Sequence, residues 1–391
     1  MTKTAKRQTT PWAVIEQAPL ASALADLKSV VDARNTVPIL ANLALVADPV
    51  RSRVSLSGTD MDRRLEIGVD ARVETAWSTT LPAHAFAALV AKLPKGCEVR
   101  LELDSGAHRI RVSAGRTVVD LPVLPVGDVP VLEGLEGEDA VEVAPAPDAW
   151  LDLQAFVSTA VSTEETRYYL NGIFLHPHKG GLRAVATDGH RLMLAELAVA
   201  AGEGGQESGI IVPRQTLPLI TTLAKAARTA DLPLVMRWSD TRLEVEAGSR
   251  RLLSKLIDGD FPDYERVIPK GQLRTLRVDP RELRGAVERV SVVTSDKSRA
   301  LTVELEPGEE RPLRLSVASP EIGYANEPVA GVLAGSDAPL RTGFNAKYLL
   351  DALGVAGGEE VTFGLGEPAQ PARLTYAAHP DRLGVLMPLR V

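Results

Sequence analysis

Hydrophobic positions along the chain follow two alternating periods. Across residues 19–34, PLASALADLKSVVDAR, apolar side chains recur every three or four positions, which is the spacing of one buried face of an α-helix. Across residues 99–112, VRLELDSGAHRIRV, they alternate with polar side chains on both sides of a Ser-Gly turn, which predicts two antiparallel strands. The order predicts a unit of helix, strands, helix and strands, in which the helices cover one face of an antiparallel sheet.

This unit occurs three times, because the same landmarks return at intervals of about 130 residues, a third of the chain. A strand-like run ends at Asp60, Asp188 and Pro320, a second helix begins near Pro82, Pro213 and Asn345, and a closing landmark stands at Pro125, Asp258 and Pro388. The connectors LEGLEGEDA near residue 135 and PKGQ near residue 270 are typical of domain boundaries. We therefore predict an α+β protein of three repeated domains, at residues 1–138, 139–270 and 271–391, with a flexible extension at residues 1–12.

Composition narrows the class of protein. Hydrophobic residues make up 45% and charged residues 24% of the chain, as in ordinary globular proteins. No apolar run approaches the ~18 residues of a membrane span, and the polar opening MTKTAKRQTTPW lacks the apolar core of a signal peptide. Cys97 is the single cysteine, which excludes an internal disulfide and a metal site built from cysteines. We expect a cytoplasmic protein without a membrane partner, a metal or a cofactor.

The net charge of −7 argues against a protein that binds nucleic acid over its whole surface. Basic residues nevertheless gather in the helical stretches 84–95, 213–230 and 281–299. From these stretches we select Lys92, Lys225 and Arg284 as candidate contacts to phosphate groups. The alternative is that these residues lie on ordinary solvated helix faces.

The usual enzyme motifs are missing from the sequence: it has no phosphate-binding loop, no nucleophile elbow, no His-Glu-x-x-His and no Cys-x-x-Cys. A hydrolase hypothesis can still be built on His190 as a base beside Asp188, in the string TDGHR. We favour a tight turn there, with Gly189 in a special backbone conformation and Asp188 bonded to local amides. His176 and His178 could hold a metal, but a third ligand is missing and Pro177 favours a solvated loop.

Several strings in the sequence stand out together: NTVPILAN at residues 35–42, RYYLNG at 167–172, ATDGHRL at 186–192, KLIDGDFPDY at 255–264, GFN at 343–345 and the terminus VLMPLRV. In this order and spacing they resemble one known family, the bacterial DNA sliding clamps, which are the beta subunits of DNA polymerase III. The resemblance spans the chain from about residue 13 to its end. Two departures stand out: the first dozen residues have no counterpart, and the terminus reads MPLRV where MPMRL is common.

The resemblance implies a processivity factor without catalytic activity, in which two protomers join head to tail in a ring around double-stranded DNA. A simple estimate agrees, because twelve helices spaced ~9 Å apart make a circle about 34 Å across, which leaves a hole of about 24 Å after one helix thickness. The six helices of one chain would leave almost none. The implied partners are the alpha subunit of DNA polymerase III, the clamp loader and other proteins with a clamp-binding motif. A divergent scaffold that binds peptides without encircling DNA remains an alternative.

By match to the family's strings, DNA is expected to contact residues near the mouth of the ring. These residues are Arg34, Arg167, Tyr168 and Tyr169. Arginine would bind phosphate groups, and tyrosine rings can stack on exposed bases. For one of the two tyrosines, packing between strands is an alternative role.

The resemblance also implies a pocket for short partner peptides that carry a glutamine and bulky aliphatic or aromatic residues. Its expected residues are Leu170, Thr187, Gly189, His190, Arg191, Leu192, Pro262, Val267, Val385, Leu386, Met387, Pro388, Leu389 and Arg390. Met387 suits a surface that accepts several related peptides, because its flexible thioether can repack. In the alternative interpretation VLMPLRV is an edge strand whose apolar residues are core, and exposure of Pro388 and its neighbours would separate the two.

Overall fold

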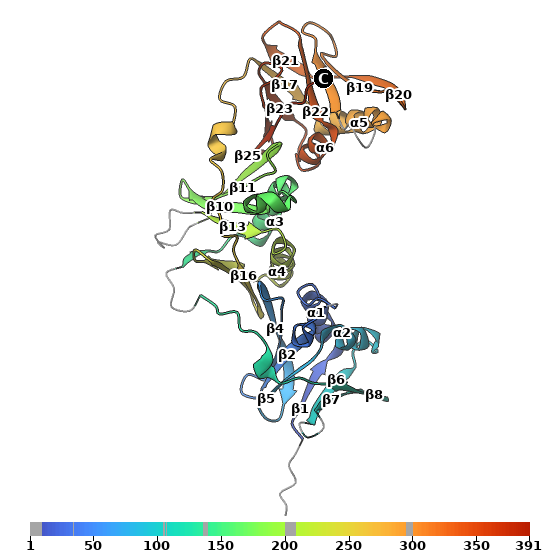
Figure 1. Cartoon of the computed structure of the whole chain (residues 1–391), viewed down its shortest axis with the longest axis vertical. Helices are drawn as coiled ribbons and strands as arrows, with labels where there is room; N and C mark the ends of the chain where they lie inside the picture. The colour runs from blue at the N-terminus through green and yellow to red at the C-terminus, as the bar shows by residue number, and fades with distance from the viewer. Residues whose placement is uncertain are drawn as a thin grey trace, which may run out of the picture. The chain divides into compact units, whose positions relative to one another are not determined.

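The computed structural model describes residues 10–33, 35–104, 106, 108–135, 140–199, 209–294 and 300–391. The chain divides into two compact units, which we describe one at a time (Figure 1). The first unit comprises Met1–Asp148, Gly202–Gly204 and Gln215–Leu256, and the second comprises Ala149–Ala201, Gly205–Arg214 and Ile257–Val391. Residues 1–9 of the expected extension lie outside the described residues, and the first strand begins at Trp12.

The first unit is built on one antiparallel sheet. Its elements are β1 (Trp12–Glu16), α1 (Gln17–Leu27), β2 (Asn42–Asp48), β3 (Arg53–Thr59), β4 (Arg63–Val73), β5 (Trp77–Pro82), α2 (Ala83–Lys92), β6 (Glu98–Asp104), β7 (Arg109–Ala114), β8 (Thr117–Pro122), β9 (Val141–Val143), α4 (Leu217–Ala230), β14 (Val235–Trp238), β15 (Arg242–Ala247) and β16 (Arg250–Lys255). The strands follow the order β8-β7-β6-β1-β4-β16-β15-β14-β9, and β3, β2 and β5 extend from β4. Helices α1 and α2 pack side by side (Figure 1).

The second unit holds two sheets. Its elements are most of α3 (Pro147–Val157), β10 (Gly172–His178), β11 (Gly181–Thr187), β12 (Arg191–Leu197), β13 (Ile210–Pro213), β17 (Arg274–Val278), α5 (Pro280–Val290), β18 (Ala300–Leu305), β19 (Leu313–Ser319), β20 (Gly323–Val329), β21 (Val332–Gly335), β22 (Leu340–Asn345), α6 (Ala346–Gly354), β23 (Val361–Leu365), β24 (Ala372–Tyr376) and β25 (His379–Leu386). The larger sheet has the order β13-β10-β11-β12-β25-β24-β23-β17-β21, and the smaller one β20-β19-β18-β22. Helices α5 and α6 pack against each other (Figure 1). Short 3₁₀ turns include η5 (Glu165–Leu170) and η6 (Tyr264–Val267).

The element order confirms the threefold repeat but corrects the expected unit. Each copy begins with a strand and not with a helix: β1, β9 and β17 precede α1, α3 and α5. These strands are short, and the apolar run Ala13, Val14 and Ile15 is fully buried, so its side chains show no alternation that would reveal a strand. The copies are therefore strand, helix, strands, helix and strands.

Local sequence fixes where several helices begin. Asn345 caps α6, since its side chain accepts hydrogen bonds from the amides of Lys347 and Tyr348, which explains why Asn345 marks the helix start. Pro82 precedes α2 directly. The expectation for Pro213 is wrong, because Pro213 ends β13 and α4 begins four residues later at Leu217. In the helix interiors, apolar residues such as Leu20 face the core, and each buried leucine contributes about 1.5–3 kcal/mol.

One turn occurs in the same form in copies one and two. In copy one the hydroxyl of Thr59 donates to the carbonyl of Arg63 and accepts from the amide of Met61. In copy two the hydroxyl of Thr187 donates to the carbonyl of Arg191 and accepts from the amide of Gly189. The following aspartate, Asp60 or Asp188, accepts hydrogen bonds from the amides of the next residue but one and of the arginine.

The strand after this turn joins each copy to the next one. In the first unit β4 pairs with β16, with Arg63 opposite Ser254. In the second unit β12 pairs with β25, with Arg191 opposite Leu386. Both pairings are antiparallel and lie at equivalent positions of the repeat. Within the described part of the chain, every helix is too short or too polar to cross a lipid bilayer.

Candidate functional site

The β12–β25 junction brings the TDGHRL turn to the last strand of the chain. Leu192 stands opposite Val385 in the register, and the amide of Met387 donates to the carbonyl of His190 at 2.9 Å. Two segments that lie far apart in the sequence therefore form one continuous surface. The candidate pocket residues come from this junction and from the loop that covers it.

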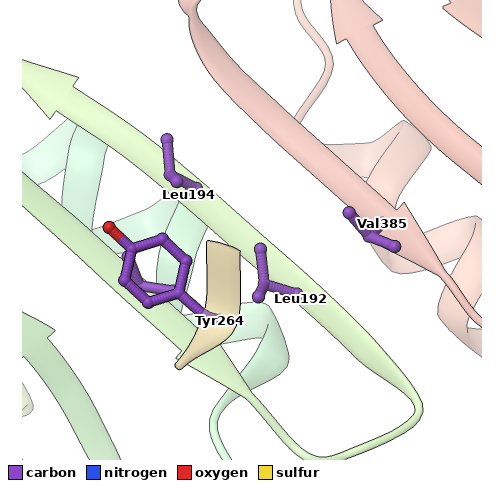
Figure 2. Close-up of a cluster of buried hydrophobic side chains, with 5 residues drawn as sticks. Leu192, Leu194, Tyr264 and Val385 are labelled. Carbon is purple, nitrogen blue, oxygen red and sulfur yellow. The ribbon is translucent and has the colours of Figure 1, made fainter. Parts of the chain in front are cut away.

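The floor of the site is a hydrophobic cluster on one face of the sheet. It consists of Val185, Leu192, Leu194, Tyr264 and Val385 (Figure 2). Leu192 is 2% and Val385 1% exposed. Figure 2 shows that the two leucines come from β12, Val385 from β25 and Tyr264 from η6. The floor is thus part of the folded core of the second unit.

Not every apolar candidate lies on an open surface. Leu170, Leu192, Val385 and Leu386 are all buried. Val385 and Leu386 are neighbours in one strand, so their burial means that both faces of β25 are covered. The strand lies between β12 and β24 and is no edge strand.

An open cavity of about 670 Å³ lies beside this floor. Val267 and Met387, which lie far apart in the sequence, both line it, and they are 46% and 39% exposed. Its other walls are the segments 266–271 and 366–371 in part. Pro262 is exposed on the same loop as Val267. The cavity therefore offers two large apolar side chains to a ligand.

The residues after Met387 are bound to the second unit by a backbone hydrogen bond. The amide of Leu389 donates to the carbonyl of Gly343 at 2.8 Å. A side chain at position 343 would meet Val391, because a Cβ built there lies 2.4 Å from the Cγ1 of Val391. Leu389 and Arg390 are exposed, whereas Pro388 is half-buried.

The polar side chains His190 and Arg191 contact two residues that sequence reasoning missed, Tyr348 and Asp351 of α6. The rings of His190 and Tyr348 are stacked with centroids 6.3 Å apart. The Arg191 guanidinium lies 4.3 Å from the centre of the Tyr348 ring and donates to Asp351 at 2.6 Å. The only signal in the sequence was the position of Tyr348, three residues after the helix cap Asn345.

Behind the floor, the Arg183 guanidinium is buried in a polar network. It donates to the hydroxyl of Tyr264 at 3.1 Å and to the carboxylates of Glu196 and Glu265. Burial by itself would raise the pKa of Glu196, but the hydrogen bond and charge of Arg183 outweigh it and lower that pKa. Burial raises the pKa of the Tyr264 hydroxyl, which stays protonated. The network fixes the loop that carries Val267.

The histidine pair belongs to this network, and the expected solvated loop is wrong. His176 and His178 lie at the end of β10, opposite Arg183 and Gly181 of β11. The Nε2 of His176 shares a hydrogen bond of 2.8 Å with the Tyr264 hydroxyl. Burial lowers the pKa of both imidazoles, so both favour the neutral form.

The turn geometry gives Asp188 a structural task. Its Oδ1 accepts from the amides of His190 and Arg191, and its Oδ2 accepts from the Arg191 guanidinium at 3.0 Å. The His190 ring is directed to Tyr348 instead. Among the residues that the structure describes, no three His, Cys, Asp or Glu side chains are grouped closely enough to hold a metal ion.

One DNA-contact candidate, Arg167, lies against the same turn, and the candidates Tyr168 and Tyr169 follow it in the chain. Arg167 pairs with Glu164 at 2.7 Å, and a Cβ built on Gly189 would lie 2.5 Å from its Nη1, so the guanidinium covers the turn glycine. The Glu164 hydrogen bond raises the Arg167 pKa further, so Arg167 remains charged. Tyr168 is exposed, and its ring meets that of Tyr169 edge to face at 5.8 Å.

The remaining DNA-contact candidates are spread over the fold. Lys92 on α2 and Lys225 on α4 are exposed in the first unit and form no ion pair with another described residue. Arg284 on α5 belongs to the second unit and forms an ion pair with Glu288 at 2.9 Å. This pair weakens the attraction of Arg284 for a phosphate group. Arg34 lies outside the described residues.

The fold and the site define a class: an α+β protein of three tandem copies, with an open cavity lined by Val267 and by Met387, which directly follows the last strand. Models of the N-terminal, central and C-terminal domains of the DNA polymerase III beta subunit match residues 13–133, 152–263 and 265–390. The chain therefore belongs to the DNA polymerase III beta subunit family, the beta sliding clamps, which confirms the resemblance and the clamp fold predicted from the sequence.

Individual relatives agree along their whole length. The beta sliding clamp of Caulobacter vibrioides is 41% identical over 384 residues, covering 96% of this chain and 99% of the relative. That of Escherichia coli is 30% identical, with coverage of 96% and 99%. A crystal structure of the Caulobacter crescentus clamp matches with a TM-score of 0.90 at 38% identity, covering 98% of this chain and all of the other. The Bartonella birtlesii clamp bound to griselimycin matches with a TM-score of 0.88 at 33% identity, with coverage of 98% and 100%.

Proposed function

We propose that two copies of this chain close head to tail into a ring around double-stranded DNA, and that the ring tethers its partners to DNA without catalysing a reaction. The partners are the alpha subunit of DNA polymerase III, the clamp loader and other proteins with a clamp-binding motif. Tethering raises the effective concentration of a bound polymerase near its template. The protein acts in the cytoplasm, and its three domains comprise residues 1–138, 139–270 and 271–391.

The strand pairing between successive copies supports ring closure. In copies one and two, the strand after the turn pairs with the last strand of the next copy, as β4 with β16 and β12 with β25. The equivalent strand of copy three is β20, and the last strand of copy one is β8. Among the described strands, β20 and β8 have a neighbour on one side only. The missing pairing is completed when β20 of one protomer meets β8 of its partner, which gives a symmetric dimer.

The side chains of these two edges fit such an interface. Tyr324 and Ile322, at or next to β20, are exposed, and so is Val118 on β8. Long open edges with exposed apolar residues are avoided in proteins that remain monomers. Pairing the two edges buries these side chains and satisfies the free backbone groups.

The single observation that carries the peptide-binding role is that Val267 and Met387 face one open cavity beside a prefolded apolar floor. Partner peptides place their aliphatic and aromatic residues there. The turn of Thr187, Gly189, His190 and Arg191 adjoins Met387, whose amide donates to the His190 carbonyl, and there the glutamine of the motif finds hydrogen-bonding groups. For DNA, Arg167 and the exposed Tyr168 supply a charge and a stacking surface close to that turn.

Two measurements test the proposal. Sedimentation should give twice the mass of one 41.8 kDa chain. After loading, the protein should stay on nicked circular DNA and slide off linear DNA with free ends. A stable monomer, or equal retention on both DNAs, would contradict the ring and favour a scaffold that binds peptides only.

A further inference from the structure

A second cavity of about 330 Å³ adjoins the one that contains Val267 and Met387. Ile268 and Lys270 line both cavities, so the two adjoin at this part of the 266–271 segment. The second cavity lies over β11, β12, β24 and β25, on the sheet face that carries Tyr264. A peptide in the first cavity therefore places its flanking residues within reach of the second one.

Each acidic group of the second cavity has a basic neighbour, although Arg183 serves two of them. Glu196 and Glu265 both bind the Arg183 guanidinium, at 2.5 and 3.1 Å. Asp381 lies 3.9 Å from the Arg382 guanidinium. The three carboxylates on the wall thus have basic partners within the fold.

Two cations of the same cavity have no such partner. Lys270 is exposed, and neither Lys270 nor Arg373 of β24 forms an ion pair with any residue that the structure describes. The second cavity therefore presents a local excess of positive charge, in spite of the acidic net charge of the chain.

Arg373 is the better placed of the two cations. It stands directly opposite Val385 in the β24–β25 register, so its backbone adjoins the apolar floor. The residue is half-buried, and its Nε is buried without a hydrogen-bond partner among the described residues. A half-buried guanidinium without an ion-pair partner attracts a carboxylate more strongly than a fully solvated one does, because less water screens its charge.

We infer that the second cavity is a subsite for an acidic side chain of a partner peptide, which Arg373 and Lys270 bind while the apolar residues of the peptide occupy the first cavity. The inference rests on the proposed peptide-binding function. A carboxylate matches the planar donor arrangement of Arg373, and the flexible Lys270 adds charge from the shared wall. Peptides with an acidic residue on this flank are thereby preferred over neutral ones.

The test compares pairs of fluorescent peptides in an anisotropy titration at low salt. Each peptide carries the same clamp-binding motif, and a single Glu or Gln is moved through the positions on either side of it. At one position the Glu peptide should bind about three- to tenfold tighter than the Gln peptide, as expected for a partly buried charge pair. The preference should shrink as salt rises.

Substitutions then assign the preference to these residues. Arg373→Gln should remove the Glu preference while the Gln peptide binds as before, and Lys270→Gln, at an exposed position that cannot disturb folding, should reduce it in part. The matched control is Arg277→Gln, an exposed arginine of β17 outside both cavities, which should keep the full preference.

The outcomes separate the subsite from the pocket. Equal binding of Glu and Gln peptides at every position would overturn the subsite and leave the pocket intact. Equal weakening of both peptides by Arg373→Gln, or an unchanged preference in both variants, would also overturn it. If neither peptide bound the unmodified protein, the proposed peptide-binding function would fail together with the subsite.

Discussion

Arg63 and Arg191 occupy the same position in two copies of one turn, and each ties its own copy to the next. In both, the Nε atom donates at 3.0 Å to the aspartate three residues earlier. Another nitrogen of Arg63 donates to the carbonyl of Gln215, just before α4, and another nitrogen of Arg191 donates to Asp351 of α6. The contact to the following copy is thus made twice with different acceptors. Only the second of these junctions adjoins the cavity with Met387.

This duplication provides a matched pair of variants. Asp188→Ala removes the acceptor of two amides and of the Arg191 guanidinium, so the turn and the His190 side chain lose their fixed position. We expect about tenfold weaker binding of a clamp-binding peptide, the effect of losing roughly one to two kcal/mol of hydrogen bonding. Asp60→Ala makes the same change in the first unit and should leave peptide affinity unchanged. Equal losses in both variants would show that the turn acts on global folding only.

The third residue is Met61 in the first turn and Gly189 in the second. We expect that exchanging the two residue types has opposite effects on stability. Met61 has φ 76° and Gly189 has φ 86°, a left-handed conformation that costs a side chain about 1–2 kcal/mol. Gly189→Met should therefore lower the midpoint of thermal unfolding and displace Arg167, which covers the glycine. Met61→Gly relieves the strain and should stabilise by less than about 1 kcal/mol, because glycine also gains entropy in the unfolded chain. Calorimetry of both variants checks the two signs, and destabilisation by Met61→Gly would argue that its side chain contributes contacts.

The fold could be predicted from the sequence because its hydrophobic patterns recur in three copies. Single short strands were missed. The threefold recurrence around Asp60 and Asp188 revealed the copies, but β9 has only three residues and no readable period. Pro177 suggested a loop, yet it lies within β10. Its missing amide is tolerated because β13 pairs with β10 only as far as Leu175, so this end of β10 has one neighbour.

Site residues that lie within one short string of the sequence could be predicted. Site residues that are brought together only by the pairing of distant strands could not. The turn at Thr187–Arg191 and the terminus around Met387 were found from local strings. Tyr348, Asp351 and Arg373 were not, because their roles depend on which strand of one copy pairs with which strand of the next. The predicted residue lists did not separate buried floor, such as Leu192, from open wall, such as Val267.

The histidine network predicts a loss of stability in mildly acidic solution. Burial lowers the pKa of His176 and His178 below the ordinary value of about 6.5, so the unfolded chain binds protons there before the folded one does. The free energy of unfolding should fall as pH drops from about 7.5 through 6.5 toward 5.5. Glu196 has a lowered pKa and contributes to pH dependence only at more acidic values. His176→Asn should flatten the curve of the unfolding midpoint between pH 7.5 and 5.5, and an unchanged slope would exclude His176 as its source.

The cavity wall formed by Met387 can be tested without disturbing the end of the chain. Deletion of Met387–Val391 should abolish peptide binding, but it also removes the Leu389 contact to Gly343. Met387→Ala keeps that contact and removes only the exposed side chain, for which we expect at least about tenfold weaker peptide binding, a typical effect at the centre of an interface. The dimer mass should stay the same in both variants. Unchanged affinity of Met387→Ala would contradict the assignment of this cavity to the peptide.

The proposed pairing of β20 with β8 of the partner makes the ring depend on two exposed edges. Tyr324 is 64% exposed on β20, so Tyr324→Asp should cost little in the isolated chain, but it would place a charge without a partner in the dimer contact. We expect the mass from sedimentation to fall toward 41.8 kDa and retention on circular DNA to be lost. Peptide affinity should remain, because the cavity with Val267 and Met387 involves other strands. The control is Val50→Asp, at an even more exposed apolar residue in a turn of the first unit, which should remain dimeric. A dimer that survives Tyr324→Asp, together with a matching Val118→Asp variant, would refute this pairing.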